Sequence, residues 1–429
     1  MSTPPVSAEA AEIIARDGVV IVGAGQAGGR CAEALRQAGF TGAITLVGHE
    51  LHLPYERPSL SKEMLLSDGE EPIAWVRPED AYAAEGVELR LGSTVVALDR
   101  ARREATLHDG STLNYGALVL ATGARPRRLN TPGAERVPLH YIRTLEDSRA
   151  LRERLGPSVR LAIIGAGFIG LEVAAAARTR GAEVVVIEAA DRIMARAVPP
   201  EISEHHLRLH RDKGVSIMLG AGLAGLEPGA GGGGVLRTDG GDRFTADLVV
   251  VGVGIEPNDE LAREAGLPTE RGVVVDEFGR TADPMVFAAG DVARHYNPLL
   301  GRHILLESWQ NAQNQAIAVA RTIAGGSAPY AEIPWFWSDQ FGVNLQVTGL
   351  AEPGCRTLIR GTPGQGPALV LQLRDGRLAS AAALDASRDL RFAKELILSG
   401  AVLDEAALAA PDVRLADLLR EVKQRKAAA

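Results

Sequence analysis

Two glycine-rich turns of the same design are the residues of this sequence whose chemistry is clearest. The first is Gly23-Ala24-Gly25-Gln26-Ala27-Gly28, and the second is Gly165-Ala166-Gly167-Phe168-Ile169-Gly170. Each follows a β-branched apolar run and opens an alanine-rich helix, which is the setting in which such a turn binds a dinucleotide. Two turns predict two dinucleotide sites on one chain. The simplest pair of ligands is a flavin and a nicotinamide, one of which passes a hydride to the other.

The three glycines of each turn have separate physical roles. The first lets the chain turn sharply out of the strand, the second leaves room for a pyrophosphate, and the third lets the helix pack close to the strand. The free N–H groups and the positive end of the helix dipole then face the phosphates. All residues of the two turns except Ala24 and Ala166 are therefore candidate cofactor-binding residues.

Composition and charge narrow the class of protein. The chain has 429 residues, 46% of them hydrophobic, which is enough for two or three domains with cores of their own. Its net charge of −8 disfavours nucleic-acid binding. Cys31 and Cys355 are the two cysteines, and they form neither a C-x-x-C pair nor a metal-ligand cluster. We expect no metal site and no redox-active disulfide, and the low cysteine content suits a reducing cytosol.

No targeting segment or membrane span is expected. Residues 1–16 lack a basic region followed by an apolar stretch, and residues 1–17 are expected to form a loose leader. The apolar stretch 159–177 contains Arg160, Glu172 and three turn glycines, and it predicts a strand, a turn and a helix. We therefore expect a soluble, cytoplasmic protein.

The elements around the turns form two similar halves. The first half is expected to contain a strand at 19–22, a helix at 28–38 and a strand at 44–47. In the second half a strand follows Arg160, a helix ends at Gly181 and a strand covers 183–188. The run 248–254 is similar to 118–124, which predicts internal repeats of one nucleotide-binding plan.

Two further regions have a distinct character. The glycine-dense stretch 221–241 is expected to form a flexible hairpin tip without chemistry, and a helix is expected at about 308–324. Past Pro329 the chain turns to tryptophans and alternating strand positions, which predicts a separate C-terminal domain.

Several motifs outside the two turns follow a known family pattern. They are Tyr55-Glu56-Arg57-Pro58-Ser59-Leu60-Ser61-Lys62, Ala121-Thr122-Gly123, Phe287-Ala288-Ala289-Gly290-Asp291, Glu307-Ser308-Trp309-Gln310-Asn311-Ala312 and Pro334-Trp335-Phe336-Trp337-Ser338-Asp339-Gln340. With these motifs the chain resembles the FAD-dependent, NADH-using ferredoxin reductases that serve Rieske oxygenases and bacterial cytochromes P450. The resemblance begins near residue 18 and extends into the C-terminal domain.

The resemblance implies an α/β fold similar to that of glutathione reductase. Two Rossmann-like dinucleotide-binding domains would be followed by a C-terminal α+β domain. The FAD-binding domain would be discontinuous, covering 1–127 and 258–328, with an NADH-binding domain at 128–257 and a C-terminal domain at 329–429.

Lys62 distinguishes this chain from related disulfide and peroxide reductases. Those relatives carry a reactive cysteine in this loop, whereas here the loop reads Ser59-Leu60-Ser61-Lys62. The resemblance implies that Lys62 places positive charge near the flavin and pairs with Glu172 on the second helix. Lys62 and Glu172 are the predicted catalytic residues. An unpaired buried carboxylate on this apolar helix face would be costly.

The resemblance also assigns residues to FAD. Asp291 would accept a hydrogen bond from a ribityl hydroxyl, while Arg57 and Lys62 would contact the pyrophosphate side and the isoalloxazine. Gly48 stands where an acid usually meets the adenosine ribose, and Glu50, two residues later, is the candidate for that contact. The remaining predicted residues of the site are Ala121, Thr122, Gly123, Arg125, Gly290, Glu307, Trp309 and Trp337.

The second site is expected to bind NADH. Glu188 ends the second strand of this half, where an acid accepts both ribose hydroxyls and repels a 2′-phosphate. Gly252 and Gly254 complete the predicted site. Arg192 and Arg196 lie nearby in sequence, so use of NADPH stays open.

The implied partner is a [2Fe-2S] ferredoxin of the Rieske or vertebrate type, served by a monomeric reductase. NADH would deliver a hydride, and the electrons would leave singly near Trp309 and the segment 335–340. Since the chain is acidic, docking of an acidic ferredoxin would need a local basic patch. The candidates for that patch are Arg294, His295, Arg302 and His303.

Three alternatives remain open at this point. The acceptor could be rubredoxin, a quinone or oxygen, since the residues would be nearly the same. A redox-sensing flavoprotein similar to apoptosis-inducing factor is a second alternative, although the net charge of −8 and the absence of a long basic run disfavour it. A disulfide or peroxide reductase is disfavoured by the missing cysteine.

Overall fold

The computed structural model describes residues 6–428, which divide into two compact units. The first unit comprises the chain up to Pro58 together with Ile73–Arg125 and Ile255–Glu332. The second unit comprises Ser59–Pro72, Pro126–Gly254 and the chain from Ile333 onward. Each unit is therefore assembled from three separate segments of the sequence.

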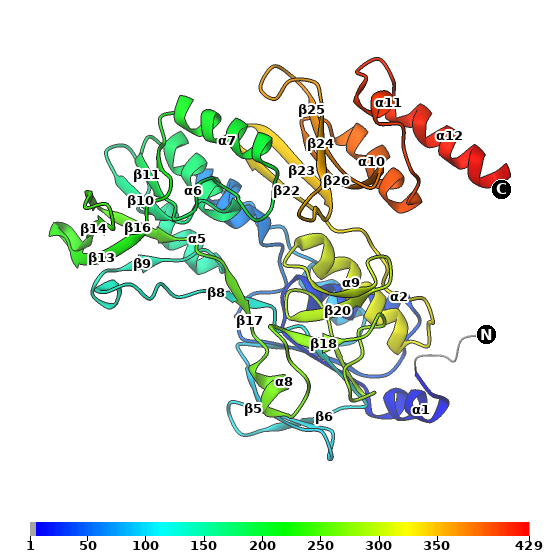
Figure 1. Ribbon diagram of the computed structural model, residues 1–429. Helices are drawn as coiled ribbons and strands as arrows, with labels where there is room; N and C mark the ends of the chain where they lie inside the picture. Colours follow the sequence, from blue (N-terminus) through cyan, green and yellow to red (C-terminus); the bar gives the residue numbers. More distant parts are fainter. Residues whose placement is uncertain (1–5, 429) are drawn as a thin grey trace. The chain divides into compact units, whose positions relative to one another are not determined.

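A five-stranded parallel sheet forms the centre of the first unit, in the strand order β19-β7-β1-β2-β3. Its strands are β1 (Val19–Val22), β2 (Ile44–Gly48), β3 (Val87–Leu91), β7 (Ala117–Leu120) and β19 (Val286–Ala288). Every residue of β1 and β7 is buried, as expected for parallel strands covered on both faces. Helices α2 (Gln26–Gln37) and α9 (Trp309–Ile323) pack side by side on this sheet (Figure 1).

Smaller elements surround this sheet. An antiparallel sheet contains β4 (Val95–Asp99), β5 (Glu104–Leu107) and β6 (Thr112–Asn114), and a third sheet contains β18 (Val273–Val275), β20 (Ala293–Asn297) and β21 (Arg302–Leu305). The remaining elements are α4 (Glu79–Ala84), α8 (Glu260–Glu264), and β8 (Ala124–Pro126) paired with β17 (Ile255–Pro257).

The prediction of a loose leader at residues 1–17 is wrong for the residues that the structure describes. Helix α1 spans Ala8–Asp17, and the Ser7 hydroxyl accepts a hydrogen bond from the backbone N–H of Ala10 at its start. Ile14 is 1% exposed and belongs to the core of the first unit. This helix has one buried residue, Ile14, so its sequence shows no helical period of buried apolar positions from which it could be predicted. Residues 1–5 lie outside the described residues.

The second unit contains its own five-stranded parallel sheet, in the order β12-β11-β10-β16-β9. The strands are β9 (Leu139–His140), β10 (Arg160–Ile164), β11 (Glu183–Ile187), β12 (Ser216–Met218) and β16 (Leu248–Val251). Its helical elements are η1 (Pro58–Ser61, shared with the first unit), α3 (Glu63–Leu66), η2 (Ala134–Arg136), α5 (Leu145–Arg152), α6 (Phe168–Thr179) and α7 (Pro200–Asp212).

Most of the glycine-dense stretch 221–241 is strand. It forms β13 (Leu223–Pro228) and β14 (Gly234–Thr238), which join β15 (Arg243–Ala246) in an antiparallel sheet, with η3 (Ala230–Gly232) at the hairpin tip. Leu226 and Leu236 are fully buried against the parallel sheet of the unit. Each of these two strands thus contributes a buried leucine to the core, which the glycine content of the stretch concealed.

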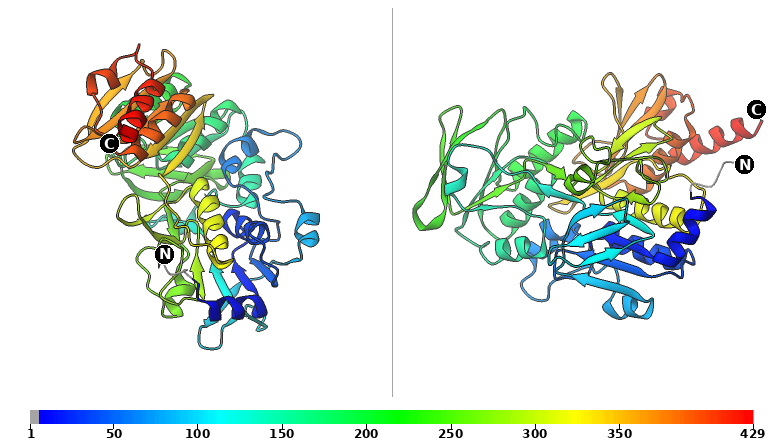
Figure 2. Two further views of the ribbon diagram at one scale, coloured as in Figure 1. Left: turned by 90° about the vertical axis from the view of Figure 1, so that its right-hand side faces the viewer. Right: turned by 90° about the horizontal axis from the view of Figure 1, so that it is seen from below.

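The C-terminal part of the second unit is an antiparallel sheet, in the order β22-β23-β26-β25-β24, followed by three helices. Its elements are β22 (Trp335–Gln340), β23 (Val343–Gly349), β24 (Arg356–Arg360), β25 (Ala368–Arg374), β26 (Arg377–Leu384), α10 (Ser387–Ser399), α11 (Glu405–Ala409) and α12 (Leu415–Ala428). Figure 2 shows α10 and α12 together beside the sheet. Leu369 and Leu371 pack toward these helices, while Val370 joins the core around α6.

The predicted α/β class with two parallel sheets and a C-terminal α+β region is confirmed. The helix expected at 308–324 is α9, and the one expected at 28–38 is α2, which begins two residues earlier. The earlier start has a physical reason, because Gly25 is the N-cap and the last glycine of the turn already lies inside the helix.

Candidate functional site

The first glycine turn is tight everywhere except at its middle glycine. Gly23 has a φ of 114°, and a Cβ there would lie 2.1 Å from the carbonyl oxygen of Ala121. A Cβ on Gly28 would lie 1.8 Å from the carbonyl oxygen of Gly23. At Gly25, in contrast, a Cβ would meet only Arg57 Nη2, at 3.8 Å. The open space at this turn therefore lies at the start of α2.

The second turn repeats this geometry. Gly165 has a φ of 99°, and a Cβ there would lie 2.5 Å from the carbonyl oxygen of Gly252. A Cβ on Gly170 would lie 2.2 Å from the carbonyl oxygen of Gly165. A Cβ on Gly167 would meet nothing within 4 Å. Steric crowding requires glycine at two positions of each turn, whereas the middle glycine leaves space.

The residues present fit a dinucleotide phosphate group at each turn. Gly25 and Gly167 are the N-caps of α2 and α6, and neither helix start has a side-chain cap hydrogen bond. The N–H groups there point toward the space that the middle glycines leave. A phosphate would accept hydrogen bonds from these N–H groups and complement the positive end of each helix dipole.

Around the first turn, Arg57 forms a polar cluster with Glu50 and Tyr55. Arg57 Nη2 donates to Glu50 Oε1 at 2.6 Å, and Tyr55 donates its hydroxyl proton to Glu50 Oε2 at 2.6 Å. The guanidinium carbon also lies 5.0 Å from the Tyr55 ring centroid. Burial acts to lower the pKa of Arg57, but its phenolic and acidic neighbours, Asp291 among them, outweigh it and raise that pKa.

The chain has a steric reason for lacking an acid at Gly48. A Cβ at Gly48 would lie 2.4 Å from the Cβ of Ala24 in the first turn. A side chain at this end of β2 would therefore require Ala24 to move. Glu50, two residues on, lies at this edge of the sheet and holds Arg57.

The loop before Asp291 lies directly against the first turn. Gly290 has a φ of 83°, and a Cβ there would lie 2.9 Å from the Cβ of Ala27. The backbone N–H of Gly290 donates to Gln315 Oε1 at 2.9 Å. Gln315 is 1% exposed and also accepts from Asn311 Nδ2 at 3.3 Å. Sequence reasoning missed Gln315, although two polar residues four apart on one helix face were a signal for a buried contact.

Other predicted residues of this site lie at the start of the two helices. Trp309 is the first residue of α9, and Glu307, two residues earlier, pairs with Arg271 at 3.7 Å. Gln26 at the start of α2 is 8% exposed, and its Nε2 donates to Gln313 of α9 at 3.4 Å. The adjacent helices α2 and α9 therefore bring these side chains to one end of the unit.

The predicted residues Thr122 and Gly123 lie just before β8 and are hydrogen-bonded to Asn258, which follows β17. Thr122 Oγ1 donates to the carbonyl oxygen of Asn258 at 2.8 Å, and Asn258 Nδ2 donates back to the carbonyl oxygen of Thr122 at 2.8 Å. Gly123 has a φ of 66° and accepts from the Asn258 N–H at 2.9 Å. Three hydrogen bonds, two of them with side-chain donors, therefore hold this segment against Asn258.

Two arginines near the sites are engaged by protein groups. Arg125 pairs with Glu256 at 2.7 Å and with Glu260 at 2.6 Å. Arg192 donates to Ser203 Oγ at 2.8 Å and to backbone carbonyls of its own loop. The Arg192 guanidinium is thus committed to internal hydrogen bonds, which reduces its suitability for a 2′-phosphate.

Glu188 lies at the second turn, as its position after β11 predicts. It accepts hydrogen bonds from the backbone N–H of Ala166 at 2.6 Å and of Ala190 at 2.8 Å. Gly254 has a φ of 103°, and a Cβ there would be 3.8 Å from Arg196 Nη2. Glu188 is therefore positioned by backbone groups of the turn itself.

Two apolar side chains open α6 beside this turn. Phe168 packs edge-on against Phe336, with ring centroids 5.0 Å apart. Ile169 is 44% exposed, which is unusual for a large apolar residue at the start of a mostly buried helix. Apolar surface is thus available next to the open space at Gly167.

Lys62 and Glu172 form a buried ion pair in the second unit. Lys62 Nζ lies 3.6 Å from Glu172 Oε1, and the side chains are 10% and 4% exposed. Ser61 Oγ donates to Glu172 Oε2 at 2.5 Å, and Ser338 Oγ donates to Oε1 at 2.6 Å. Burial raises the pKa of the Glu172 carboxyl, and the ammonium and the two hydroxyls oppose that rise. Lys62 Nζ also lies 5.7 Å from the Trp337 ring centroid.

Trp337 itself stacks on Trp335, with ring centroids 5.3 Å apart and an interplanar angle of 23°. Both tryptophans lie on β22 with their neighbours Ser338 and Gln340. The aromatic pair thus belongs to β22, and Lys62 belongs to the loop that contacts Trp337 of this strand.

The prediction that His295 belongs to a basic surface patch is wrong. His295 is 1% exposed, and burial lowers its pKa to about 4, so it is neutral near pH 7. Arg294 pairs with Glu270 at 3.2 Å, and Arg302 and His303 are exposed. Inward-facing positions on β20 alternate with outward-facing ones, which explains why His295 is buried while Arg294 is not.

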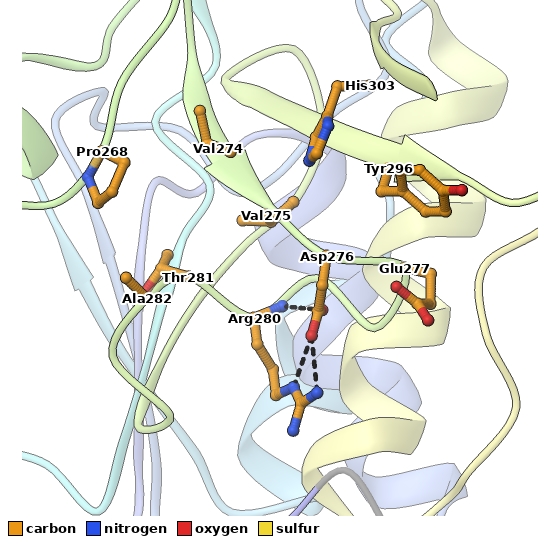
Figure 3. A pocket seen from close by; sticks show the side chains of 10 residues that line it. All are labelled: Pro268, Val274, Val275, Asp276, Glu277, Arg280, Thr281, Ala282, Tyr296 and His303. Carbon is orange, nitrogen blue, oxygen red and sulfur yellow. Dashed lines mark hydrogen bonds and ion pairs between the residues drawn. The ribbon is translucent and has the colours of Figure 1, made fainter. Parts of the chain in front are cut away.

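A separate hollow of about 450 Å³ lies in the first unit next to these residues (Figure 3). Its wall includes Tyr296 and His303, whose rings meet edge-on at 5.5 Å, and the ion pair of Asp276 and Arg280 at 2.7 Å. None of the residues predicted to bind FAD or NADH lines it.

The two cysteines of the chain are not bonded to each other. Cys31 and Cys355 are unpaired thiols, and burial raises the pKa of Cys31 to about 12. Residues 6–428 hold no group of three His, Cys, Asp or Glu side chains that could bind a metal ion. None of their helices is long and apolar enough to cross a membrane.

Two glycine turns with open space for phosphates, on two parallel sheets, are typical of enzymes that bind two dinucleotides. The chain belongs to the pyridine nucleotide-disulphide oxidoreductase family, whose model matches residues 17–316. A reductase C-terminal model matches residues 335–419.

Named relatives are similar over nearly the whole chain. The ferredoxin–NAD(+) reductase component of the anthranilate 1,2-dioxygenase system of Burkholderia cepacia is 47% identical, covering 94% of this chain and 99% of the relative. Rhodocoxin reductase of Rhodococcus erythropolis is 40% identical, covering 93% and 94%. Putidaredoxin reductase, solved in a covalent complex with putidaredoxin, has a TM-score of 0.91 at 36% identity, covering 95% of this chain and 99% of that one.

These relatives place the chain among the ferredoxin–NAD(+) reductases of this family, which are oxidoreductases that use FAD and NADH. The expected resemblance, enzyme class and cofactors are confirmed.

Proposed function

We propose that this protein oxidises NADH and passes the electrons singly to a [2Fe-2S] ferredoxin that feeds an oxygenase or a cytochrome P450. The observation that carries the proposal is the buried Lys62–Glu172 pair, in the loop where the family resemblance places a reactive cysteine in disulfide and peroxide reductases. Bound FAD would supply the conversion of a hydride into two separate electrons. The similarity to named ferredoxin reductases of dioxygenase and P450 systems supports the choice of partner.

In the first unit, the protein's task is to bind and orient FAD. The N–H groups at the start of α2 would hold the pyrophosphate, with Arg57 supplying positive charge beside them. Asp291, on the loop that packs against the turn, would accept the ribityl hydrogen bond. Glu50 would bind the adenosine ribose, because the usual position at Gly48 is sterically closed.

In the second unit, the start of α6 would hold the phosphates of NADH. Glu188 would accept the ribose hydroxyls, and its negative charge would repel a 2′-phosphate. Its two backbone hydrogen bonds fix the carboxylate at the turn. Arg192 is held by internal acceptors, which supports a preference for NADH.

Lys62 and Glu172 would act on the reacting region without becoming nucleophiles. The ammonium supplies positive charge in a site with little water, where a charge has a larger effect than in solution. Glu172 balances that charge and holds Lys62 in place. Trp337 would limit the positions open to the ammonium and exclude water.

We further propose the three-domain division at 1–127 with 258–328, at 128–257 and at 329–429, with the protein acting as a monomer in the cytoplasm. The two unpaired cysteines support a reducing compartment. Sedimentation velocity at several concentrations tests the oligomeric state.

Anaerobic stopped-flow mixing tests the function. The flavin band near 450 nm is followed after mixing with NADH or NADPH, and a [2Fe-2S] ferredoxin is then added. Fast bleaching by NADH, slow bleaching by NADPH and rapid reoxidation by ferredoxin support the proposal. Reoxidation only by quinone, rubredoxin or oxygen would assign a different acceptor, and absence of bound flavin would refute the assignment of the first turn.

The surface proposed for ferredoxin docking is formed by the half-buried Arg294 and by the exposed Arg302 and His303. Charge reversal at Arg294 and Arg302 should raise the KM for ferredoxin and leave reduction of a small dye by NADH unchanged. Charge reversal at Arg90, an exposed arginine on β3, is the matched control. Unchanged kinetics with ferredoxin in the double variant would remove this surface from the proposal.

A further inference from the structure

A chain of buried hydrogen bonds extends from Glu172 to helix α7. Ser338 Oγ donates to Glu172 Oε1 at 2.6 Å, and Gln340 Nε2 donates to Ser338 Oγ at 3.0 Å. His210 Nε2 lies 2.8 Å from Gln340 Oε1. Ser338, Gln340 and His210 are 0%, 1% and 0% exposed. All four of these hydrogen-bonded residues belong to the second unit.

The direction of this chain follows from donor and acceptor chemistry. The amide oxygen of Gln340 can only accept, so the proton of the neutral His210 ring must sit on Nε2. His210 Nδ1 is buried and has no hydrogen-bond partner among the described residues. Every donor therefore points toward the carboxylate of Glu172.

The strand and the helix explain how these side chains meet. Ser338 and Gln340 are two apart on β22, so both face inward, while Asp339 between them bonds Asn344 Nδ2 at 2.6 Å. His210 lies in the last turn of α7, and its ring contacts Phe341 with centroids 5.0 Å apart.

Burial and neighbouring charges shift the pKa values of the two titratable groups at the ends of this hydrogen-bond chain, Glu172 and His210. Burial raises the pKa of Glu172, and the charge of Asp339 adds to the rise, while Lys62 opposes it. Burial lowers the pKa of His210 to about 4, although its bond to Gln340 acts the other way. The neighbouring His206 on α7 has a pKa lowered to about 4 as well. Near pH 7 both rings are neutral, so His210 serves as a neutral donor.

We propose that Ser338, Gln340 and His210 are positioning residues, whose aligned donors keep the Glu172 carboxylate ionised and directed at Lys62. The proposal rests on the proposed role of the Lys62–Glu172 pair in NADH oxidation. It adds that the donors supporting this pair extend, through Ser338 and Gln340, to a histidine on a different helix. Without the donors, burial would favour the protonated acid, which cannot balance the ammonium.

Nuclear magnetic resonance tests the far end of the chain. In protein labelled with ¹⁵N-histidine, the ring nitrogens of His210, assigned with H210F, should show the Nε2–H form at pH 7. Gln340→Met, which removes both amide contacts at similar volume, should change these ring signals. A Nδ1–H form, or unchanged signals in the Gln340 variant, would overturn the proposal.

Infrared spectroscopy tests the near end. The pH titration of the Glu172 carboxyl band, assigned with E172Q, should shift upward by about one to two pH units in Ser338→Ala, the range for a lost hydrogen bond to a charge. Gln340→Met should shift it in the same direction by less. Ser61→Ala is the matched control, because it removes a donor to the other oxygen and should leave the His210 signals unchanged. An unmoved midpoint in the Ser338 and Gln340 variants would refute the proposal.

Stopped-flow kinetics then separates this proposal from the function itself. The pH profile of flavin reduction by NADH should move with the carboxyl titration, and the KM for NADH should change less than kcat. If the spectroscopic shifts occur and the kinetics do not follow, the donor chain exists and the proposed role of the ion pair is wrong. Near-ultraviolet circular dichroism verifies that each variant is folded.

Discussion

Replacement of Lys62 by methionine isolates the energetics of the buried ion pair. The variant keeps the apolar stem of the side chain and removes a charge that lies 3.6 Å from Glu172 Oε1. Coulomb's law at an effective dielectric constant of about 20 gives about 4 to 5 kcal/mol for unit charges at this separation. Removal of one partner of a buried pair typically costs about 3 to 5 kcal/mol of unfolding free energy. We expect K62M to lose about 4 kcal/mol at pH 8.

The loss should depend on pH with a defined sign. The pKa of Glu172 in the folded protein is raised above its unfolded value by burial, and loss of Lys62 raises it further. A raised carboxyl pKa stabilises the folded state at low pH, and this stabilisation disappears as pH rises through the folded pKa. The stability difference between K62M and the parent should therefore be largest near pH 8 and shrink toward pH 5.

A double-mutant cycle measures this coupling by chemical denaturation. K62M, E172Q and the double variant are compared with the parent at pH 8 and pH 5, with Lys423→Met as the control at an exposed pair. The double variant should be more stable at pH 8 than K62M, because no uncompensated charge remains buried. A coupling energy below about 1 kcal/mol, or a loss in K62M that grows toward pH 5, would refute this reasoning.

Further predictions concern the turns, the second site and a buried histidine. Gly167→Ala should fold normally, because its Cβ position is open, and should raise the KM for NADH, because the added methyl group would block the phosphates. Gly165→Ala should lower thermal stability, because Gly165 has a φ of 99°. Glu188→Ala should raise kcat/KM for NADPH relative to NADH by about tenfold or more, measured by steady-state kinetics; an unchanged ratio would contradict its ribose role. His295, with a pKa lowered to about 4, should contribute stability that is lost as pH falls from about 6.5 to 4, and His295→Leu should weaken that pH dependence in denaturation curves.

The sequence predicted the two turns and their sheets because the information is local. Gly23 and Gly165 are required by positive φ angles and by close backbone atoms, so each glycine carries a specific structural meaning. Two such turns with β-branched strands before them predicted two similar nucleotide-binding halves, and the family resemblance implied the fold class. The exact roles of the predicted site residues stay predictions, because they concern contacts with ligands.

Other features depended on distant contacts that no local pattern records. The contact of Gln340 with His210 joins residues 130 positions apart, and Gln315 reaches Gly290 across 25 positions. The burial of His295 was missed because charge was counted without regard to strand alternation. The helix at Ala8–Asp17 was missed because its single buried residue, Ile14, shows no period.

The assembly of each unit from three chain segments has a consequence for synthesis on the ribosome. Strand β7 receives its outer partner, Val286–Ala288, only after the first two segments of the second unit have been made. At about 5 to 20 residues per second, tens of seconds separate β1 from β19. During this interval the apolar edge at Leu118–Leu120 and the face later covered by α9 have no native partner. The nascent chain should therefore depend on chaperones, and chains that end before Val286 should aggregate.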